Sequence, residues 1–385
     1  MRHLTVILFS FLLLLLFLAE HVMASSKPET SDEDGKIMSQ MEENLELEEI
    51  DRSLKEILEY DQFSFRDTVL SLIRGEIPFQ TDTWKKLVTE TLIREVAQQK
   101  TLALQVLLIV LTAAVFSSFT RVFRSSQVAD ICYYIMYLLV SVLLMQSFGI
   151  MNEVTWQAVQ SLISMMKVLL PAYLLTIVFC AGTLTASGYS QILLFAFSLT
   201  EVFLERVMIP AVNFYLVLLI LNQMAKEDYF SKFAELVELA VSWGIRTVFG
   251  IIAGLQAVQC LISPAVDSLK NGALHKAAKA IPGIGNTLDA AAETIAGCAV
   301  VIKNAVGVAG MAAILVLCLV PVCKLVCCIL MLRILSAVIQ PVGESRLADC
   351  ISYTAQASSL LLRILLTAMG IFMISTALIT ASVKG

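Results

Sequence analysis

The sequence predicts an all-α, polytopic α-helical membrane protein with an N-terminal signal sequence and a small helical region outside the cytoplasm. Hydrophobic residues make up 58% of the 385 residues and charged residues only 15%, whereas soluble domains carry about 25% charged residues. The charge is also unevenly placed. Residues 25–100 hold 10 Lys/Arg and 18 Asp/Glu, a net charge of −8, and residues 101–385 hold 16 and 13, a net charge of +3. A charged, water-facing region therefore precedes a membrane domain.

Residues 1–24 read as a secretory signal peptide. Arg2 gives the positively charged n-region, and Leu4 to Leu18 form the apolar h-region. The small residue Ala24 offers a cleavage site before Ser25. An uncleaved signal anchor is the alternative. Either form places the next segment on the far side of the membrane.

Residues 25–100 form the predicted acidic helical extracytoplasmic region. After a polar tether at 25–36, apolar residues recur at spacings of three and four, which predicts a helix: Leu47, Ile50, Leu54 and Ile57. A second helix is expected from Phe65 to Arg74, and a third from about Thr81 or Asp82. Two interpretations stay open for this region, a docking domain for a partner outside the membrane or a cap folded on the chain's own membrane domain.

Residues 101–385 form the predicted polytopic membrane domain, with seven or eight spans. A span needs about 20 mostly apolar residues. The clear candidates are 102–119, 131–150, 162–183, 243–262 and 360–382. Arg121 and Arg124 follow the first of these, so the positive-inside rule places that loop in the cytoplasm. An amphipathic interfacial helix is expected at 224–242.

Two apolar blocks leave their path through the membrane open. Residues 191–223 carry Glu201, Glu205 and Arg206 before Pro210, and form either one long helix kinked at the proline or a re-entrant segment followed by a span. Glu201 and Glu205 are four residues apart, which would place them on one helix face. Charges inside a membrane indicate a functional site, although an interfacial helix with its charges in water is the alternative. The second block, 306–339, reads as two half-spans or a broken helix pair around Pro321.

Few residues are of the types and spacings that form a metal-binding or catalytic site. All nine cysteines lie beyond residue 130, and Cys323, Cys327 and Cys328 are better explained as small apolar residues of a buried helix than as a metal site. His275 is the one histidine beyond the signal region, which argues against a zinc site or a Ser/His/Asp triad. Neither catalytic residues nor a cofactor is predicted. The chain also lacks the basic patches of a nucleic-acid-binding protein.

The most unusual stretch is 279–310, KAIPGIGNTLDAAAETIAGCAVVIKNAVGVAG. Pro282, Gly283 and Gly285 indicate a turn before a helix rich in small residues. The polar pair Lys303-Asn304 would pair with Glu293 or Asp289, or would lie at the membrane surface. The glycine spacing does not fit a phosphate-binding loop.

This stretch resembles the signature region of the stage III sporulation protein AE family of endospore-forming Firmicutes. The resemblance rests on Pro282 with its following glycines, on Glu293-Thr294, on Gly297, and on the run from Lys303 through Asn304 to Gly307. The layout of signal, acidic helical region and polytopic domain agrees over nearly the whole chain. The spacing of acidic residues before Glu293 departs from the family pattern, so the resemblance implies no role for Asp289.

The resemblance implies a non-enzymatic membrane subunit of a channel-like, secretion-type sporulation complex. Its location would be the mother-cell-derived outer forespore membrane, with residues 25–100 facing the intermembrane space. Its partners would be membrane lipid, other membrane subunits, an ATPase and a forespore protein across that space. The complex would support forespore integrity and late forespore sigma-factor activity.

The alternative interpretation is a stand-alone secondary transporter, whose midplane site would combine the charges of the 191–223 block with Lys303 and Asn304. An intramembrane enzyme is disfavoured, because no HExxH, GxSxG or paired-Asp motif is present. Under the first interpretation, the residues expected to line a conduit or contact a subunit are Pro282, Gly285, Glu293, Thr294, Gly297, Lys303, Asn304, Gly307, Glu201, Glu205 and Arg206.

Overall fold

The computed structural model describes most of the membrane domain and two helices of the N-terminal region. The described residues are 47–58, 64–74, 126–181, 183–224, 228–278, 285–341 and 345–381, with separate positions between 93 and 112. The predicted signal peptide, the polar tether, most of the third N-terminal helix and most of the span at 102–119 lie outside these residues. Within them, every regular element is helical.

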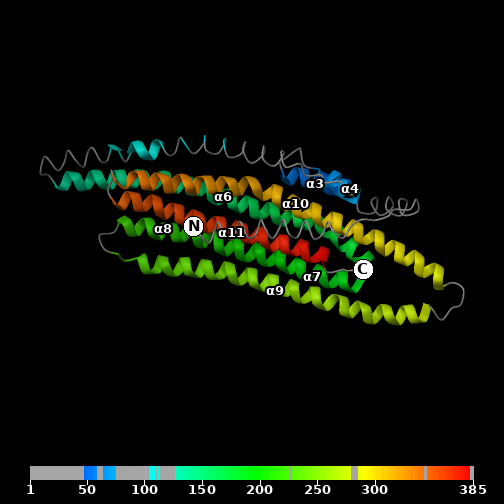
Figure 1. The fold of residues 1–385 in the computed structure, drawn as a ribbon. Helices are drawn as coiled ribbons and strands as arrows, with labels where there is room; N and C mark the ends of the chain where they lie inside the picture. The colour runs from blue at the N-terminus through cyan, green and yellow to red at the C-terminus, as the bar shows by residue number, and fades with distance from the viewer. Residues whose placement is uncertain are drawn as a thin grey trace.

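Long helices run up and down beside one another in an elongated bundle (Figure 1). They are α6 (Ser126–Ala181), α7 (Thr183–Leu199), the π-helix η1 (Thr200–Met208), α8 (Ile209–Met224), α9 (Ser231–Ala278), α10 (Gly285–Ile339) and α11 (Ser345–Ala381). Because η1 joins α7 to α8 without a break, these three form one rod. Among the described residues, five stretches are long and apolar enough to cross a membrane. The fold is therefore all-α and consistent with a polytopic membrane protein.

Several breaks predicted from hydropathy are absent, and these predictions were wrong. The expected spans 131–150 and 162–183 both lie in α6, and the expected interfacial helix and span around residue 243 both lie in α9. The residues between the first two, 151–161, are polar but contain neither glycine nor proline. Polar residues lower hydropathy without ending a helix, whereas glycine and proline are the residues that do so.

Prolines lie inside long helices without ending them. Pro171 is in α6, and Pro321 is in α10, where two half-spans or a broken pair had been predicted. A proline removes one backbone hydrogen bond and clashes with the preceding turn. In a bundle, packing of neighbouring helices and local adjustment compensate for that loss. The block at 191–223 likewise follows the continuous alternative, with η1 directly before Pro210.

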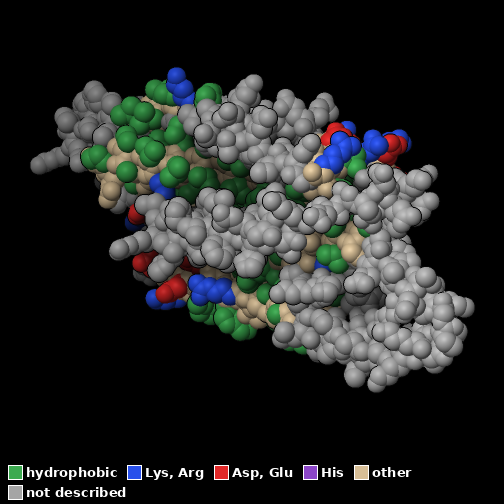
Figure 2. All heavy atoms as spheres, turned by 45° about the vertical axis from the view of Figure 1, so that its right-hand side comes forward, with side chains coloured by type: hydrophobic (Ala, Val, Ile, Leu, Met, Phe, Trp, Pro, Cys, Tyr) green, Lys and Arg blue, Asp and Glu red, His purple; other side chains and the backbone are tan. Residues whose placement is uncertain are grey.

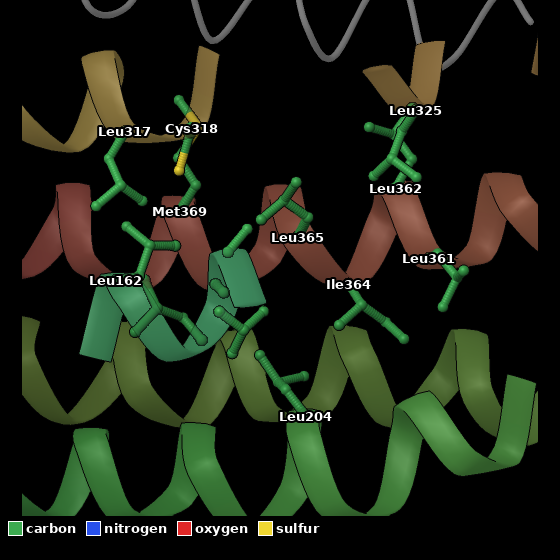
Figure 3. Packing of buried hydrophobic residues seen from close by; sticks show 14 of the residues in the cluster. Leu162, Leu204, Leu317, Cys318, Leu325, Leu361, Leu362, Ile364, Leu365 and Met369 are labelled. Atoms are coloured by element: carbon green, nitrogen blue, oxygen red, sulfur yellow. The ribbon is translucent and has the colours of Figure 1, made fainter. Parts of the chain in front are cut away.

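Helix α11 lies at the centre of the bundle. In an 18-residue apolar window of α11, 72% of residues are buried, against 28% in the corresponding window of α9. Figure 3 shows its side chains directed both ways, with Leu362 beside Leu325 of α10 and Ile364 directed toward the rod that carries Leu204. The hydroxyls of α11 bond mainly to its own backbone, as in Ser358 Oγ to Thr354 O at 2.7 Å. Polar residues are thus accommodated inside an apolar core.

The outer surface of the bundle is strongly apolar. Large hydrophobic side chains on α6 are exposed along one side: Ile131, Ile135, Leu138, Leu139, Val142 and Met145. Figure 2 shows hydrophobic side chains over much of the described part of one face, with charged side chains in small groups. Such a surface suits contact with lipid rather than water.

Helices α3 (Leu47–Leu58) and α4 (Phe65–Ile73) confirm two of the predicted N-terminal helices. They lie over α6 and α10 (Figure 1). Leu54, Phe65 and Val69 are fully buried and belong to the same core as the bundle. The described part of the acidic region is therefore folded as a cap on the chain's own long helices.

The carboxylate of Asp51 in α3 accepts hydrogen bonds from the N-terminal residues of α4. Its Oδ1 accepts hydrogen bonds from Phe65 N at 2.7 Å, Ser64 Oγ at 3.1 Å and Arg66 N at 3.3 Å, and its Oδ2 pairs with Lys55 Nζ at 2.7 Å. A carboxylate at a helix N-terminus satisfies backbone N–H groups and complements the helix dipole. Burial acts to raise the pKa of Asp51, but Lys55 and these hydrogen bonds outweigh it and hold the pKa below its ordinary value.

Asp51→Asn is expected to loosen the α3–α4 cap. Asparagine keeps the shape but loses the charge, and hydrogen bonds to charged groups contribute about 1.5–3 kcal/mol. Hydrogen exchange and limited proteolysis at residues 47–74 should therefore accelerate in the variant. Asp67→Asn is the matched control, because Asp67 is exposed on the same hairpin. Equal exchange rates in the two variants would contradict this role for Asp51.

The hydrogen bonds and the ion pair of Asp51 also predict that the stability of the α3–α4 cap depends on pH. Because the folded pKa of Asp51 lies below the unfolded pKa, the stabilisation is complete above the unfolded value and is lost as pH falls through the folded value. Acid should therefore lower the protection factors of the α3 and α4 amides, which compare exchange with the intrinsic rate at each pH, in the natural chain. In the Asp51→Asn variant, that acid-dependent loss of protection should be smaller.

Candidate functional sites in the helix bundle

The π-helix η1 carries a cluster of charged side chains. Glu201 accepts a hydrogen bond from Arg206 Nη2 at 3.0 Å, and its other oxygen lies 3.8 Å from Lys167 Nζ of α6. Lys167 and Arg206 are largely exposed, whereas Glu201 is half-buried. Glu201 therefore joins η1 to α6 through a solvent-accessible or interfacial ion-pair network.

Glu201 and Glu205 have different surroundings, and a shared functional face stays a prediction. In the π-helix the backbone bonds connect residues five apart, as in Ile209 N to Leu204 O. Arg206, five residues after Glu201, donates to the Glu201 carboxylate. Glu205 is only 9% exposed.

Glu205 contacts a residue that the sequence did not single out. Trp156 of α6 donates its indole Nε1–H to Glu205 Oε1 at 2.9 Å. The other oxygen, Oε2, is buried and has no hydrogen-bond partner in the described structure. The same holds for Asn152 Oδ1, one turn before Trp156 on α6. A tryptophan among polar residues of an apolar helix was the available signal, but its partner Glu205 is 49 residues away in the sequence.

A glycine lets α9 approach η1 closely. A Cβ built on Gly244 would lie 3.2 Å from Met208 Sδ and 3.3 Å from Phe203. Such distances are tighter than ordinary contacts, so a larger residue would push the helices apart. Gly250 and Gly254 of α9 have the GxxxG spacing that is common at contacts between membrane helices, but a Cβ at either would meet nothing within 4 Å. The close contact therefore involves a glycine that belongs to no recognised motif.

The second candidate region, 279–310, lies mainly in the first half of α10. Pro282 lies outside the described residues. Gly285 begins α10, and Glu293 and Thr294 lie in its helical backbone, with side chains that fall outside the described part. Gly297 is exposed, and a Cβ there would meet nothing within 4 Å.

Lys303 is buried in α10 with 1% of its surface exposed, and Asn304 beside it is half-buried. Lys303 takes part in a polar or electrostatic interaction. Pairing with Glu293 or Asp289 is not compatible with the fold, because all three belong to one helix. Ten residues of helix separate Lys303 from Glu293 by about 15 Å, and Asp289 is farther. The alternative, a position at the membrane surface, stays a prediction, because burial between helices does not fix the depth of Lys303 in the membrane.

Two glycines in this region allow close helix packing. A Cβ on Gly307 would overlap the Thr380 methyl group of α11, and a Cβ on Gly310 would overlap the Tyr173 hydroxyl of α6. Both glycines are buried. Thr380 is next to the end of α11 and can change rotamer, whereas the Tyr173 ring is fully buried. Gly307 and Gly310 thus fix how closely α10 approaches α11 and α6.

The two regions lie in different parts of the helix packing. The π-helix η1 packs against α6, α9 and α11, and the main neighbours of α10 are α11, α6 and α4. The transporter interpretation combined the charges of both regions in one site, and the described contacts do not bring them together. Among the described residues, no group of three His, Cys, Asp or Glu side chains is placed to hold a metal ion.

Comparison with known proteins decides the family. A family model described as stage III sporulation protein AE matches residues 63–383, which covers the membrane bundle and α4. The chain belongs to the stage III sporulation protein AE family. The resemblance seen in the signature stretch is thereby confirmed.

A curated relative agrees with this assignment. The chain is 21% identical over 342 residues to stage III sporulation protein AE of Bacillus subtilis (strain 168), and the match covers 86% of each chain. No solved structure matches the chain. The protein is thus a membrane protein of a family involved in stage III of sporulation, and that family is not a known enzyme family.

Proposed function

We propose that the chain is a non-enzymatic, multi-pass subunit of a channel-like, secretion-type complex that endospore formation requires. It acts as a scaffold or conduit, and the first half of α10 contributes to the conduit or to a contact with another subunit. Its partners are membrane lipid, other membrane subunits including an ATPase, and a forespore protein. The complex supports forespore integrity and late forespore sigma-factor activity.

The observation that carries this proposal is the family match over residues 63–383. The match is not limited to one motif, since it includes α4 and every long helix of the bundle. Buried Lys303 and the closely packed Gly307 supply a physical reason for the KNAVG run. Buried charges inside membrane helices indicate function more often than structure alone.

The proposed location is the mother-cell-derived outer forespore membrane, with residues 25–100 in the intermembrane space. The signal sequence and the arginine-containing loop after the first predicted span support this orientation. The cap of α3 and α4 would then lie on the bundle at the side that faces the forespore.

A stand-alone secondary transporter is the second candidate function. The observation that favours it is the π-helix, which places Glu201, Glu205 and Arg206 midway along the length of a long apolar rod. Interrupted helices with charged residues are typical of transporter binding sites. This alternative no longer includes Lys303 and Asn304.

Deletion of the gene in its spore-forming host tests the two functions. The complex predicts collapsed or small forespores and loss of late forespore sigma-dependent transcription, both restored by the natural gene. The transporter predicts normal spores and a defect in uptake of a solute. Normal forespores with normal late transcription would contradict the complex.

A further inference from the structure

Tryptophan and basic side chains form an exposed belt at the level of η1. The belt consists of Trp156 and Lys167 of α6, Arg206 of η1, and Trp243 and Arg246 of α9. Trp156 is 40% exposed and Trp243 is 69% exposed. Tryptophan together with lysine or arginine is typical of the level at which a membrane protein passes from hydrocarbon to lipid headgroups.

Contacts with η1 hold the belt residues near one level of the bundle. Trp156 donates to Glu205 at 2.9 Å. Glu201 lies 3.0 Å from Arg206 Nη2 and 3.8 Å from Lys167 Nζ. The α9 members of the belt flank the glycine that packs closely against η1. The belt therefore crosses three neighbouring elements.

On one side of the belt, two helical segments contain no charged residue. They are 131–152 in α6 and 207–224 in η1 and α8, with 22 and 18 residues. At 1.5 Å per residue they are about 33 Å and 27 Å long, close to the thickness of about 30 Å of the hydrocarbon core. Tyr137 Oη donates to Ile220 O at 2.8 Å, so the two segments lie side by side. The exposed apolar row of α6 is in this part of the bundle.

The neighbouring helices carry charged side chains on this side of the belt. Glu238 of α9 accepts hydrogen bonds from Tyr215 Oη at 3.0 Å and Gln356 Nε2 at 3.1 Å. Exposed Arg333 lies six residues before the end of α10, about 9 Å along the helix, and its long stem lets the guanidinium approach the headgroups at that end. Hydrogen-bonded charges and charges that reach the headgroups are the kinds that membrane helices tolerate.

The cap of α3 and α4 lies on the other side of the belt. Figure 1 shows it beside α6 and the first half of α10. Gly310 of α10 meets Tyr173 of α6, six residues after Lys167 and farther from the charge-free segment. The outer surface of the cap carries exposed charged residues: Glu48, Glu49, Arg52, Arg66 and Asp67. Because these charges need water, hydrocarbon does not surround this half of the bundle.

The lengths of the helices require such a division. Helix α6 has 56 residues and α10 has 55, so each is about 83 Å long, whereas a bilayer with its headgroups is about 40–45 Å thick. Even a tilt of about 40°, the upper end of the usual range, leaves about 20 Å of each helix outside the bilayer.

We infer that the belt contacts lipid headgroups, that the charge-free segments cross the hydrocarbon, and that the cap and the first half of α10 project from the bilayer. The partner of the belt is a phospholipid surface, whose phosphates attract Lys167, Arg206 and Arg246. Lys303 and Gly310 then lie in the projecting half. This inference goes beyond the proposed function, and only the side of projection, the extracytoplasmic one, rests on the orientation proposed above. It places the η1 charges at the membrane surface, away from the midplane where transporters bind their substrates.

The test measures the depth of single tryptophans in the full chain, reconstituted into vesicles of phosphatidylcholine and phosphatidylglycerol. Bromine atoms placed on the lipid chains, either near the headgroups or near the chain ends, quench tryptophans at their own depth, and iodide quenches tryptophans in water. Trp243 is read after Trp84→Phe and Trp156→Phe. With Trp243→Phe added, Leu139→Trp reports the apolar row of α6 and Asp67→Trp reports the cap, because both positions are exposed.

We expect bromine near the headgroups to quench Trp243 most, bromine near the chain ends to quench Leu139→Trp most, and only iodide to quench Asp67→Trp. Strongest quenching of Trp243 by chain-end bromine, or by iodide alone, would overturn the belt. Quenching of Asp67→Trp by either brominated lipid would show that the cap is embedded and would refute the projection. If Trp156→Phe does not fold, Trp156 is kept and Trp243 is read as the difference that Trp243→Phe makes. Headgroup-level quenching of Trp243, together with normal spores after gene deletion, would refute the proposed function alone.

Discussion

Gly310→Ala is expected to destabilise the bundle severely. The added Cβ would overlap the hydroxyl oxygen of Tyr173 and lie 3.1 Å from its Cζ atom. Tyr173 is 1% exposed, so its ring cannot move into solvent, and α10 must shift away from α6. Overpacking a close-packed core costs about 1–3 kcal/mol or more, which exceeds the gain of about 1 kcal/mol that alanine brings to a helix.

Tyr173→Phe should restore much of the stability of Gly310→Ala. Removing the hydroxyl leaves Cζ as the nearest atom, at a tight but tolerable distance. Phenylalanine also loses no described hydrogen bond, because the Tyr173 hydroxyl is buried without a partner. The single Tyr173→Phe variant should therefore be as stable as the natural chain or more stable.

Thermal unfolding in detergent and the amount of monodisperse protein on size exclusion measure these effects. Gly297→Ala is the matched control, since it adds the same methyl group to the same helix at an exposed position with open space. The control should match or exceed the natural stability. Equal stability of Gly310→Ala and Gly297→Ala, or a Tyr173→Phe that brings no recovery, would show that α10 and α6 are not packed in this way.

The contact between Gly310 and Tyr173 illustrates what the sequence could not predict. Both residues lie in predicted membrane helices, and small residues were expected to allow close packing. The two residues are 137 positions apart in the sequence, and no local sequence pattern predicts their contact. The same limit applies to Trp156 and Glu205, and to Gly244 with Met208. Periodicity predicts which face of a helix is buried, whereas the partner depends on the whole bundle.

Local patterns were sufficient for the α3–α4 hairpin. The spacing of Leu47, Ile50, Leu54 and Ile57 predicted the first helix, and the second was predicted to begin at Phe65, where α4 begins. Short helices of this kind are defined by amphipathic periodicity and caps. The bond from Asp51 that caps α4 was not foreseen, because it crosses between the helices.

Hydropathy predicted the helix boundaries wrongly where a helix continues through polar residues. The expected spans ended at 150 and began again at 162, but the residues between them are helical and include Trp156, which donates to Glu205. The π-helix was not predicted, because its sequence has no distinctive signature. Glu201, Glu205 and Arg206 were singled out as charges in an apolar block, and their individual contacts come only from the structure.

Lys303→Glu is expected to abolish accumulation of the folded chain and spore formation. Lys303 is 1% exposed and engaged in a polar or electrostatic interaction. Reversal replaces a donor by an acceptor and puts a carboxylate into an environment that solvates it poorly. A buried polar group left without a partner costs about 1–3 kcal/mol, and more when the group is charged, against the roughly 5–15 kcal/mol that typically stabilises a folded domain.

Arg333→Glu is the matched control for this reversal. Arg333 lies on the same helix, but its side chain is exposed, so its reversal leaves no buried partner without its interaction. Membrane accumulation measured by immunoblot and heat-resistant spore counts should be close to natural for Arg333→Glu and absent for Lys303→Glu. Because the control changes charge by the same amount, any difference between the two variants reports the environment of Lys303 rather than the net charge of α10.

Lys303→Met separates a structural role from a functional one. Methionine approximates the length and volume of the lysine stem without its charge, so the variant should accumulate far better than Lys303→Glu. If the first half of α10 acts in a conduit or subunit contact, spore formation should still fall in Lys303→Met cells that contain normal amounts of the protein. Full spore counts in both Lys303→Met and Lys303→Glu would instead show that the buried charge serves neither folding nor the complex, and would remove the main physical reason for assigning a function to the KNAVG run.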